Sequence, residues 1–381
     1  MDISKDGGQK ILIFSTAYFP FIGGAELAVK EITERIPNIQ FDMITARLNR
    51  KLPRVEKIGN VNVYRIGPGI PMIDKYWLAF LGRFFAQKLH KKNQYNLIWS
   101  IMASYGGFTA MFFKKKNPQT PFLLTLQEGD DPEYIKKRVG IAKSWFKRIF
   151  ASADCIQCIS QFLADWAKQN GATCPIEVVP NGVDLDKLKT KNEKRKTNEK
   201  IIITTSRLVY KNGIDVLIRA AVKLKKIAPD LSFKVQILGS GSDEKKLKDL
   251  TKKLEVNDVV RFLGHIEPEK VYDCLAGADI FVRPSRSEGL GSSFLEAMAA
   301  GVPVIGTPVG GIPDFLEDPS TRSGQVATGL FTKVDDPEDL ALKIKELLEN
   351  ENLRQNLVQN GLKLVKEKYN WNLIAGKMKN I

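Results

Sequence analysis

The sequence predicts an α/β protein made of two doubly wound, Rossmann-like halves, and three observations support this fold class. Short aliphatic or β-branched runs alternate with amphipathic helical patterns, which favours βα units around parallel sheets. The alternation stops at a charged stretch without apolar core residues, residues 186–200, and then starts again. The length of 381 residues also exceeds what one hydrophobic core usually supports.

The elements of the first half follow one another in a regular order. Residues 10–16 (KILIFST) predict the first strand, and residues 25–36 (AELAVKEITERI) predict the first helix. Further along, strands are expected over 97–101, 121–126, 155–160 and 176–180, and helices over 106–115 and 161–169. We therefore expect a first domain over residues 1–190.

The second half repeats the pattern after a predicted linker at 191–199. Strands are expected over 200–206, 233–240, 259–264, 280–285 and 302–307, with helices that start near Asn212, Ser242 and Ser293. Asp336 and Pro337 supply an N-cap and a first-turn proline for a helical final stretch. The second domain is expected over 200–365, with its ligand at the carboxyl ends of the strands.

The charge of the chain is positive and unevenly placed. The net charge is +15, and residues 75–148 hold 14 basic and 4 acidic side chains, which suggests attraction to phosphate-bearing partners. Residues 75–92 and 134–150 place Lys and Arg beside aromatic residues at helical spacing. Such segments either lie on an anionic membrane or turn an apolar stripe toward the core, and both interpretations stay open.

The remaining composition excludes several protein classes. No run approaches the roughly 18 apolar residues of a membrane span, and the first strand does not resemble a secretory signal. Four cysteines are too few for a disulfide scaffold, and Cys155 and Cys158 fall on opposite faces of a strand. The chain has two histidines, which do not favour a histidine-based metal site or a catalytic triad. We expect a cytoplasmic protein.

The chemistry is expected in residues 285–311 (SRSEGLGSSFLEAMAAGVPVIGTPVGG). Glu288 lies on the loop after a strand, and the following backbone amides lead into a helix N-terminus, which favours an anion such as phosphate. Glu288 and Glu296 then serve hydroxyl groups, because a carboxylate accepts hydrogen bonds and repels phosphate. A capping box between Ser293 and Glu296 is the local alternative. Gly310 and Gly311 follow the next strand, so two glycine-containing loops are expected to converge.

Together these motifs resemble the family 4 retaining glycosyltransferases of the GT-B fold. The resemblance covers nearly the whole chain and rests on an ordered set: GGAE (23–26), VVPNGVDLDKL (178–188), SRLVYKNGIDVLIRA (206–220), ILGSGSDEKKL (237–247), residues 262–285 and residues 288–311. It implies two Rossmann-like domains that face a central cleft. It also implies a C-terminal helix, 366–381, that crosses back to the first domain.

The resemblance assigns roles to individual residues. It implies that Glu288 lies beside the transferred hexose and that Glu296 binds ribose hydroxyls. Arg207 matches the diphosphate-binding arginine, while the usual lysine position holds Asn212, so Lys211 is assigned to phosphate. The remaining donor-binding candidates contribute backbone close to the ligand and are Gly23, Gly24, Gly289, Leu290, Gly291, Ser292, Gly310 and Gly311.

One position departs from the family pattern. Many relatives place a histidine at the end of the strand 121–126, where this chain has Gln127. Glutamine binds a sugar hydroxyl but carries no charge. Either the reaction proceeds without the histidine, or Glu128, Asp130 or Asp131 has taken a role. We expect no cofactor and no essential metal, because Arg207 and Lys211 neutralise the leaving group.

The expected function is transfer of a hexose from a UDP- or GDP-linked sugar, with retained configuration, to a glycan or lipid-linked acceptor of the cell envelope. Partners are the donor, the acceptor and an anionic membrane surface, and no nucleic acid is expected. Two alternatives remain: a sugar-nucleotide epimerase of the same fold, and a non-catalytic basic protein that binds membrane or nucleic acid.

Overall fold

The computed structural model describes residues 8–140, 143–185, 199–317 and 326–381. The chain divides into two compact units. The first comprises Met1–Asn181 and Trp371–Ile381, and the second comprises Gly182–Asn370. Residues 191–198 of the predicted linker lie outside the described residues.

The first unit is built on an eight-stranded sheet in the order β3-β4-β2-β1-β5-β6-β7-β8. Its strands are β1 (Gln9–Ser15), β2 (Ile39–Ala46), β3 (Val55–Ile58), β4 (Val61–Ile66), β5 (Leu97–Ile101), β6 (Phe122–Leu126), β7 (Cys155–Cys158) and β8 (Ile176–Val178). Neighbouring strands pair in parallel, except that β3 and β4 form an antiparallel pair. The doubly wound α/β arrangement expected from the alternating runs is thus present.

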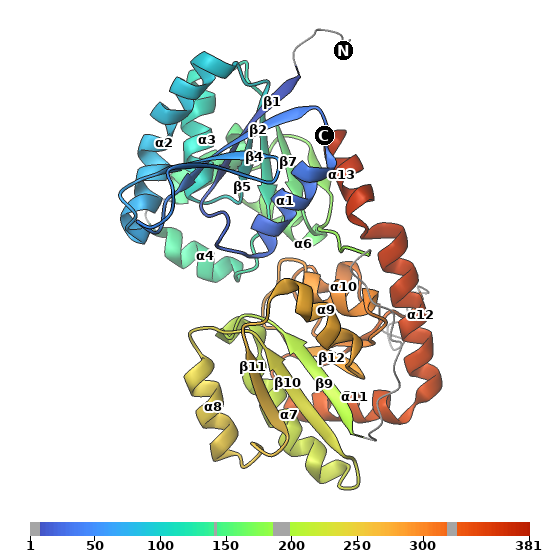
Figure 1. Ribbon diagram of the computed structural model, residues 1–381. Helices are drawn as coiled ribbons and strands as arrows, with labels where there is room; N and C mark the ends of the chain where they lie inside the picture. The colour runs from blue at the N-terminus through green and yellow to red at the C-terminus, as the bar shows by residue number, and fades with distance from the viewer. Residues whose placement is uncertain (1–7, 141–142, 186–198, 318–325) are drawn as a thin grey trace. The chain divides into compact units, whose positions relative to one another are not determined.

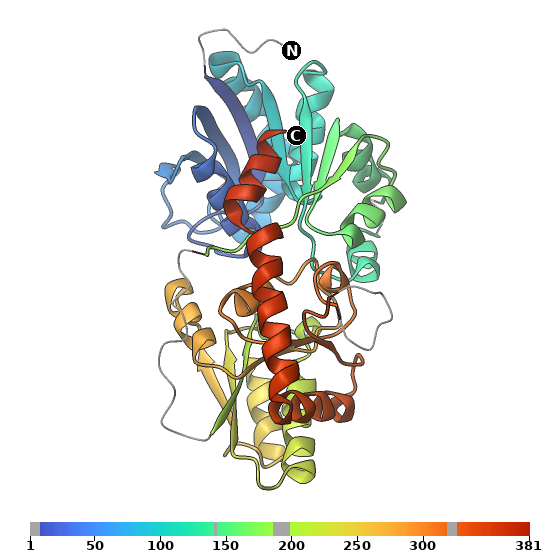
Figure 2. The same ribbon diagram turned by 90° about the vertical axis from the view of Figure 1, so that its right-hand side faces the viewer.

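Helices cover both faces of this sheet (Figures 1 and 2). They are α1 (Gly24–Arg35), α2 (Pro71–Asn93), α3 (Tyr105–Lys116), α4 (Pro132–Val139), α5 (Lys143–Ser152), α6 (Gln161–Gln169) and α13 (Trp371–Lys379). Ile13 and Trp99 point into a core that α1 and α13 close, with Ile32 and Ile374 among its members. The next residue, Phe14, points to the opposite face and packs on Phe113 of α3, as strand alternation requires.

The second basic segment differs from its prediction. Residues 134–150 form parts of two helices, α4 and α5, and not one continuous amphipathic helix. Gly140 follows α4 with a φ of 51°, a backbone conformation that favours glycine and ends the helix.

The second unit holds a six-stranded parallel sheet in the order β11-β10-β9-β12-β13-β14. Its strands are β9 (Lys200–Thr205), β10 (Phe233–Leu238), β11 (Val260–Gly264), β12 (Ile280–Arg283), β13 (Val304–Gly306) and β14 (Leu330–Phe331). Its helices are α7 (Ile214–Ile227), α8 (Glu244–Lys253), α9 (Pro268–Ala276), α10 (Ser292–Ala299), α11 (Pro337–Glu349) and α12 (Glu351–Lys368), with short 3-10 turns at Tyr210–Asn212 and Ile312–Asp314.

Glycines bring the loops at the carboxyl edge of this second sheet into close contact. A Cβ on Gly213, after β9, would lie 1.9 Å from the carbonyl oxygen of Pro284, after β12. A Cβ on Gly239, after β10, would lie 1.9 Å from the carbonyl oxygen of Ser206. Real side chains cannot occupy these distances, so the glycines let three neighbouring loops pack backbone against backbone. The GSGS sequence after β10 is a strand-to-helix turn, as predicted.

Candidate active site

The two glycine-containing loops after β12 and β13 meet at the carboxyl edge of the second sheet. Gly310 has a φ of 57°, and a Cβ at this position would lie 1.7 Å from the carbonyl oxygen of Glu288. The predicted convergence of the Glu288 loop and the Gly310 loop is therefore correct. Gly311 follows as the N-cap of the 3-10 turn Ile312–Asp314.

Arg283 connects the loop and the helix at this edge, and it was not among the residues predicted from the sequence. Its side chain forms an ion pair with Glu288 and donates a 2.6 Å hydrogen bond to the hydroxyl of Ser293. The guanidinium also lies over the ring of Phe294, 5.3 Å from its centroid. An arginine that ends the apolar strand IFVR could have been flagged from the sequence, because a buried arginine needs a carboxylate partner.

Glu296 lies on the first turns of α10 and does not form the capping box. The helix begins at Ser292, its N-cap is Gly291 with a φ of 97°, and no side chain caps it. Ser293 is already inside the helix and binds Arg283 instead. Within the described residues the Glu296 carboxyl accepts no hydrogen bond, and burial raises its pKa to about 7, against the opposing effect of Arg283. This half-buried carboxyl is available to a ligand.

Of the four backbone amides that follow Glu288, one donates a hydrogen bond to a described residue and three do not. The Gly289 amide donates to Glu288's own Oε1 at 3.2 Å. The amides of Leu290, Gly291 and Ser292 donate to no other residue in the described part of the chain. Because they lie at the N-terminus of α10, they add to the positive end of its dipole. The Leu290 side chain is buried, so this residue offers its backbone only.

Arg207 and Lys211 lie on the loop after β9, which packs against the β12 loop through Gly213. The Arg207 side chain is exposed, and its guanidinium bonds to no other described residue. Asn212, which stands at the family's lysine position, is buried and donates to the Arg207 carbonyl at 2.7 Å. Asn212 therefore shapes the turn, and Lys211 is the cation beside it.

A second arginine ties these loops together. Arg286 binds both carboxylate oxygens of Asp215 at 2.8 and 2.9 Å and Asp335 at 2.7 Å. It also stacks on Tyr210, 4.1 Å from the ring centroid, and its amide donates to the Lys211 carbonyl. Bidentate pairing of this kind fixes geometry, so Arg286 holds the loop that carries Lys211 against the loop that carries Glu288.

Buried hydroxyl groups without a hydrogen-bond partner among the described residues lie at the end of β9. They are those of Thr204 within the strand and of Thr205 and Ser206, the two nearest to Arg207. Buried hydroxyls are usually satisfied, so these two are further candidates to bind polar atoms of a ligand. They could not be predicted from the sequence, because serine and threonine at a strand end are common in turns.

Gln127 and Glu128 directly follow β6 in the first unit and have different surroundings. The Gln127 side-chain oxygen accepts from Asn181 at 3.0 Å. The Glu128 carboxyl is buried, and it accepts from the amides of Ala103 at 2.6 Å and Gln127 at 2.9 Å. Burial raises its pKa to about 7, opposed by these hydrogen bonds. Glu128 therefore joins two loops through these hydrogen bonds.

Asp131 and Gly23 have local roles at helix N-termini. Asp131 caps α4 by accepting from the amides of Glu133 and Tyr134. Gly23 is the N-cap of α1 in extended backbone, and no side chain caps this helix. A Cβ on Gly24 would meet no atom within 4 Å, so open space surrounds this position.

No metal centre is formed by the described residues: no three His, Cys, Asp or Glu side chains come together. Cys155 and Cys158 are free thiols on β7, and burial raises the pKa of both. The prediction that this pair lies on a strand is confirmed.

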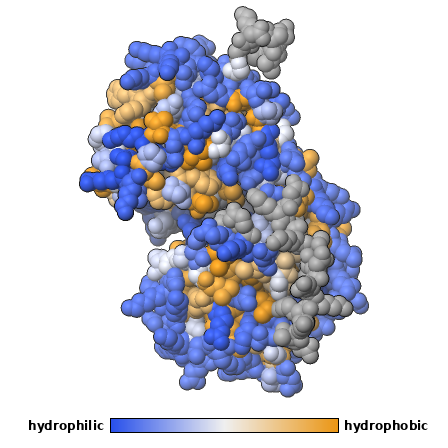
Figure 3. Space-filling view, viewed as in Figure 1, coloured by the Kyte–Doolittle hydropathy of each residue, from blue (hydrophilic) through white to orange (hydrophobic). Residues whose placement is uncertain are grey.

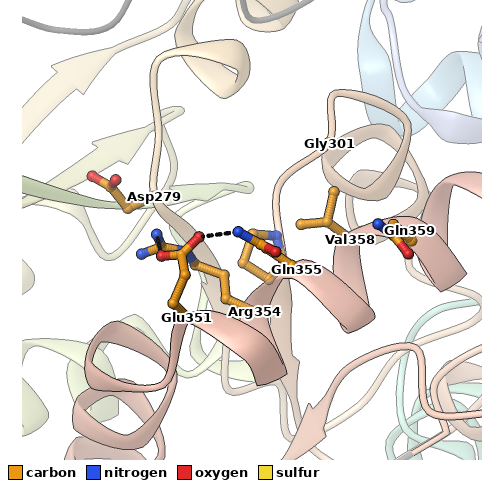
Figure 4. A pocket seen from close by; sticks show the side chains of 8 residues that line it. Asp279, Gly301, Glu351, Arg354, Gln355, Val358 and Gln359 are labelled. Carbon is orange, nitrogen blue, oxygen red and sulfur yellow. Dashed lines mark hydrogen bonds and ion pairs between the residues drawn. The ribbon is translucent and has the colours of Figure 1, made fainter.

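A pocket of the second unit lies at the opposite edge of the sheet. Asp279 and Pro303, which directly precede β12 and β13, line it together with Glu351, Arg354 and Gln355 of α12 (Figure 4). Glu351 pairs with Arg354 and Gln355 within the helix. None of the predicted site residues lines this pocket.

Comparison with known proteins places the chain among sugar-transferring enzymes. Residues 22–187 match the model "Glycosyltransferase Family 4", and residues 186–364 match the model "Glycosyl transferases group 1". An uncharacterized glycosyltransferase of Methanocaldococcus jannaschii is 26% identical over 403 residues, which cover 98% of this chain and 97% of that protein. A Corynebacterium glutamicum mannosyltransferase, GDP-mannose-dependent and acting on a monoacylated phosphatidylinositol monomannoside, is 32% identical over 62% of this chain and 63% of its own length.

Solved structures share the fold. The sucrose-phosphate synthase of Thermosynechococcus elongatus superimposes with a TM-score of 0.81 at 22% identity, covering 98% of both chains. Anabaena HepE, in complex with UDP and glucose, superimposes with a TM-score of 0.76 at 19% identity and also covers 98% of both chains.

Proposed function

The chain belongs to the family 4, group 1 glycosyltransferases, and we propose that it transfers a hexose from a UDP- or GDP-linked sugar with retained anomeric configuration. Its fold is GT-B, with two Rossmann-like α/β domains. The fold and family therefore agree with the expectation from the sequence. The residue roles, the donor and the acceptor are proposals.

One observation carries the proposal: among the described residues, the Glu296 carboxyl on α10 and the amides that lead into this helix have no hydrogen-bond partner. Glu296 accepts no hydrogen bond from the described residues, and the amides of Leu290, Gly291 and Ser292 donate none to them. A ligand that carries hydroxyl donors next to a diphosphate complements both groups. The ribose and diphosphate of a nucleotide have this combination.

The proposed reaction begins when the bond between the anomeric carbon and the diphosphate oxygen breaks. The electron pair leaves with the diphosphate, and Arg207, Lys211 and the α10 amides stabilise the negative charge that develops there. The acceptor hydroxyl then bonds to the anomeric carbon from the same face, and its proton passes to the departing phosphate oxygen. Glu288, held by Arg283, accepts hydrogen bonds from hexose hydroxyls. This route needs no strong base on the protein, which is consistent with Gln127.

The neighbours support a nucleotide-sugar donor. Anabaena HepE was solved with UDP and glucose, and the Corynebacterium glutamicum relative depends on GDP-mannose. We propose that the donor belongs to this class and that no essential metal takes part, because Arg207 and Lys211 supply the positive charge that a metal would otherwise provide.

We also propose a glycan or lipid-linked acceptor of the cell envelope, reached from the cytoplasmic face of the membrane. The phosphatidylinositol mannoside acceptor named for the Corynebacterium glutamicum relative supports the lipid-linked class. Among the helices of the described residues, none has the length and apolar composition that a bilayer crossing requires. We propose that contact with a membrane is peripheral.

A thermal-shift panel of UDP, GDP and their hexose conjugates tests the donor proposal. A ligand at 100 times its dissociation constant stabilises the folded state by about 2.7 kcal/mol. We expect one nucleotide family to raise the melting temperature, with ADP and free phosphate as controls. Equal shifts with every polyanion would instead support a basic protein without a nucleotide site.

A further inference from the structure

Helix α2 buries Leu78 and several small residues and leaves its aromatic residues exposed. Ala79, Gly82 and Ala86 face the protein, and a Cβ on Gly82 would lie 2.9 Å from the side chain of Thr109 of α3. The outer face carries large hydrophobic side chains that are between 38% and 56% exposed: Tyr76, Trp77, Phe80, Leu81, Phe84 and Phe85. Helix α2 therefore turns a narrow apolar stripe toward the core, and its large aromatic side chains lie on a second, exposed face.

The exposed face continues from α2 across α3 to α5. Phe112 of α3 lies between Phe80 of α2, at a ring separation of 6.4 Å, and Trp145 of α5, at 5.7 Å. Trp145 is 44% exposed. Figure 3 shows hydrophobic residues gathered on the surface where Figure 1 draws α2. We refer to Tyr76, Trp77, Phe80, Leu81, Phe84, Phe85, Phe112 and Trp145 as the aromatic face.

Positive charge is mixed into this face. Arg83 lies over the rings of Phe84 and Phe112, 4.6 and 5.5 Å from their centroids, and Arg148 lies over Trp145 at 5.5 Å. The acidic residue of α2, Asp74, is buried, and its carboxylate accepts from the amides of Leu48 and Gly69. The outer surface of α2 is thus aromatic and cationic, without a negative charge of its own.

We infer that the aromatic face docks on a lipid bilayer whose surface is anionic. Aromatic side chains are favoured at the level of lipid headgroups, where one part of the ring is wet and the other dry. Arginine and lysine beside them are attracted to anionic lipids by on the order of 1 kcal/mol each. A second copy of the chain fits less well, because a two-fold interface would bring Arg83 and its neighbours toward their own like charges.

The inference rests on the proposed peripheral location and names the surface and partner that would produce it. It does not depend on the donor site, since all of its residues belong to the first unit. Nucleotide binding and vesicle binding are therefore separate measurements. A protein that binds UDP or GDP but no vesicle would overturn this inference and leave the transferase proposal standing.

Tryptophan fluorescence makes the test specific to this face. Trp77 and Trp145 are 41% and 44% exposed, whereas Trp99, Trp166 and Trp371 are buried. Full-length protein is mixed with vesicles of phosphatidylcholine alone or with added phosphatidylglycerol, some carrying brominated acyl chains. We expect sedimentation with the anionic vesicles that fades as salt is added. Bromine should quench the emission of the wild-type protein, and the double variant Trp77→Phe, Trp145→Phe should bind but lose the quenching.

Paired variants distinguish membrane binding by the aromatic face from nonspecific adsorption of exposed hydrophobic residues. Phe80→Ser with Phe84→Ser should reduce the bound fraction at least 10-fold, while Leu342→Ser, an equally exposed leucine of α11 in the second unit, should not. Circular dichroism and the nucleotide-induced thermal shift should stay unchanged in both. Wild-type protein that stays in the supernatant at low salt, or a dimer in solution that the two serines dissociate, would contradict docking on a bilayer.

Discussion

Arg283, the last residue of β12, forms an ion pair with Glu288 in the loop that follows the strand. The same guanidinium binds Ser293 at the start of α10. One side chain therefore fixes the position of the proposed sugar-binding carboxylate relative to the helix that carries Glu296. Removal of either partner leaves a largely buried charge without compensation, which is costly.

Arg283→Gln should lower kcat by about 10- to 100-fold with a smaller effect on the nucleotide dissociation constant, because it releases Glu288 and leaves the α10 amides in place. Arg283→Lys keeps the charge and should recover part of the activity. Steady-state kinetics and nucleotide titration separate the two effects. Arg219→Gln, at an exposed arginine of α7, is the matched control. A loss confined to nucleotide affinity would argue against a positioning role.

Glu288→Gln should reduce turnover by about 100-fold or more while sparing nucleotide binding. The variant keeps the size of the side chain and loses the charge that accepts hydrogen bonds from hexose hydroxyls and pairs with Arg283. Turnover is measured by release of nucleotide diphosphate, and binding by calorimetry with the free nucleotide. Unchanged turnover would remove Glu288 from the site.

Arg207→Ala should weaken nucleotide-diphosphate binding by about 10-fold or more, and affinity for the nucleoside alone should not change. The guanidinium is exposed and bonds to no other described residue, so the melting temperature without ligand should change by less than 1 °C or so for a surface substitution. Equal affinity of variant and wild type for the diphosphate would rule out Arg207 as a ligand.

Glu296 should make nucleotide affinity depend on pH. Burial raises its pKa to about 7 from 4.5, so its charged form costs folding free energy as the pH rises through that window, on the order of 3 kcal/mol. Ribose hydroxyls that donate to the carboxylate favour the ionised form. Nucleotide affinity should therefore increase from pH 6 to pH 8.

Glu296→Gln supplies the control for that pH dependence. The variant should bind nucleotide more weakly at pH 8, with an affinity that is nearly flat from pH 6 to pH 8. Its melting temperature relative to wild type should rise over the same range, because the cost of the buried charge is gone. A wild-type affinity that falls with rising pH would contradict the assignment of Glu296 to hydroxyl groups.

Gly310→Ala should disrupt the contact between the β12 and β13 loops. A Cβ would lie 1.7 Å from the Glu288 carbonyl oxygen, and the positive φ adds strain, so a loss of about 2 kcal/mol or more in unfolding free energy is expected. Urea denaturation measures this loss. Gly376→Ala, where a Cβ on α13 meets no atom within 4 Å, should be neutral or slightly stabilising. Equal stability of the two variants would contradict the packing described here.

Much of the architecture was readable from the sequence, because buried parallel strands appear as short apolar runs between amphipathic helices. Strand β2 is less visible, since Asp42 interrupts its apolar run. The structure shows how this carboxyl is satisfied, by Asn62 at 2.8 Å, Asn93 at 2.9 Å and the Tyr95 hydroxyl at 2.5 Å. Such long-range partners cannot be inferred from local pattern.

The motifs of the site were predictable from the sequence, but the side-chain contacts that connect its loops were not. The sequence placed Glu288, Glu296 and Gly310 at one sheet edge, because consecutive strand ends meet there. It wrongly left a capping box open for Glu296, since S-x-x-E looks the same whether the serine is the N-cap or already helical. The roles of Arg283 and Arg286 depend on partners from other loops, and the outward aromatic face of α2 depends on which side of the helix meets α3.

The central claim is tested most directly by the fate of the donor sugar. The protein is incubated with the nucleotide sugar selected by the thermal-shift panel and a lipid-linked or glycan acceptor fraction, and the reaction is followed by proton NMR. We expect nucleotide diphosphate to be released as the sugar appears on the acceptor, with the anomeric coupling of the donor preserved. A product with inverted configuration, or epimerised donor in the absence of any acceptor, would contradict the proposal of a retaining glycosyltransferase.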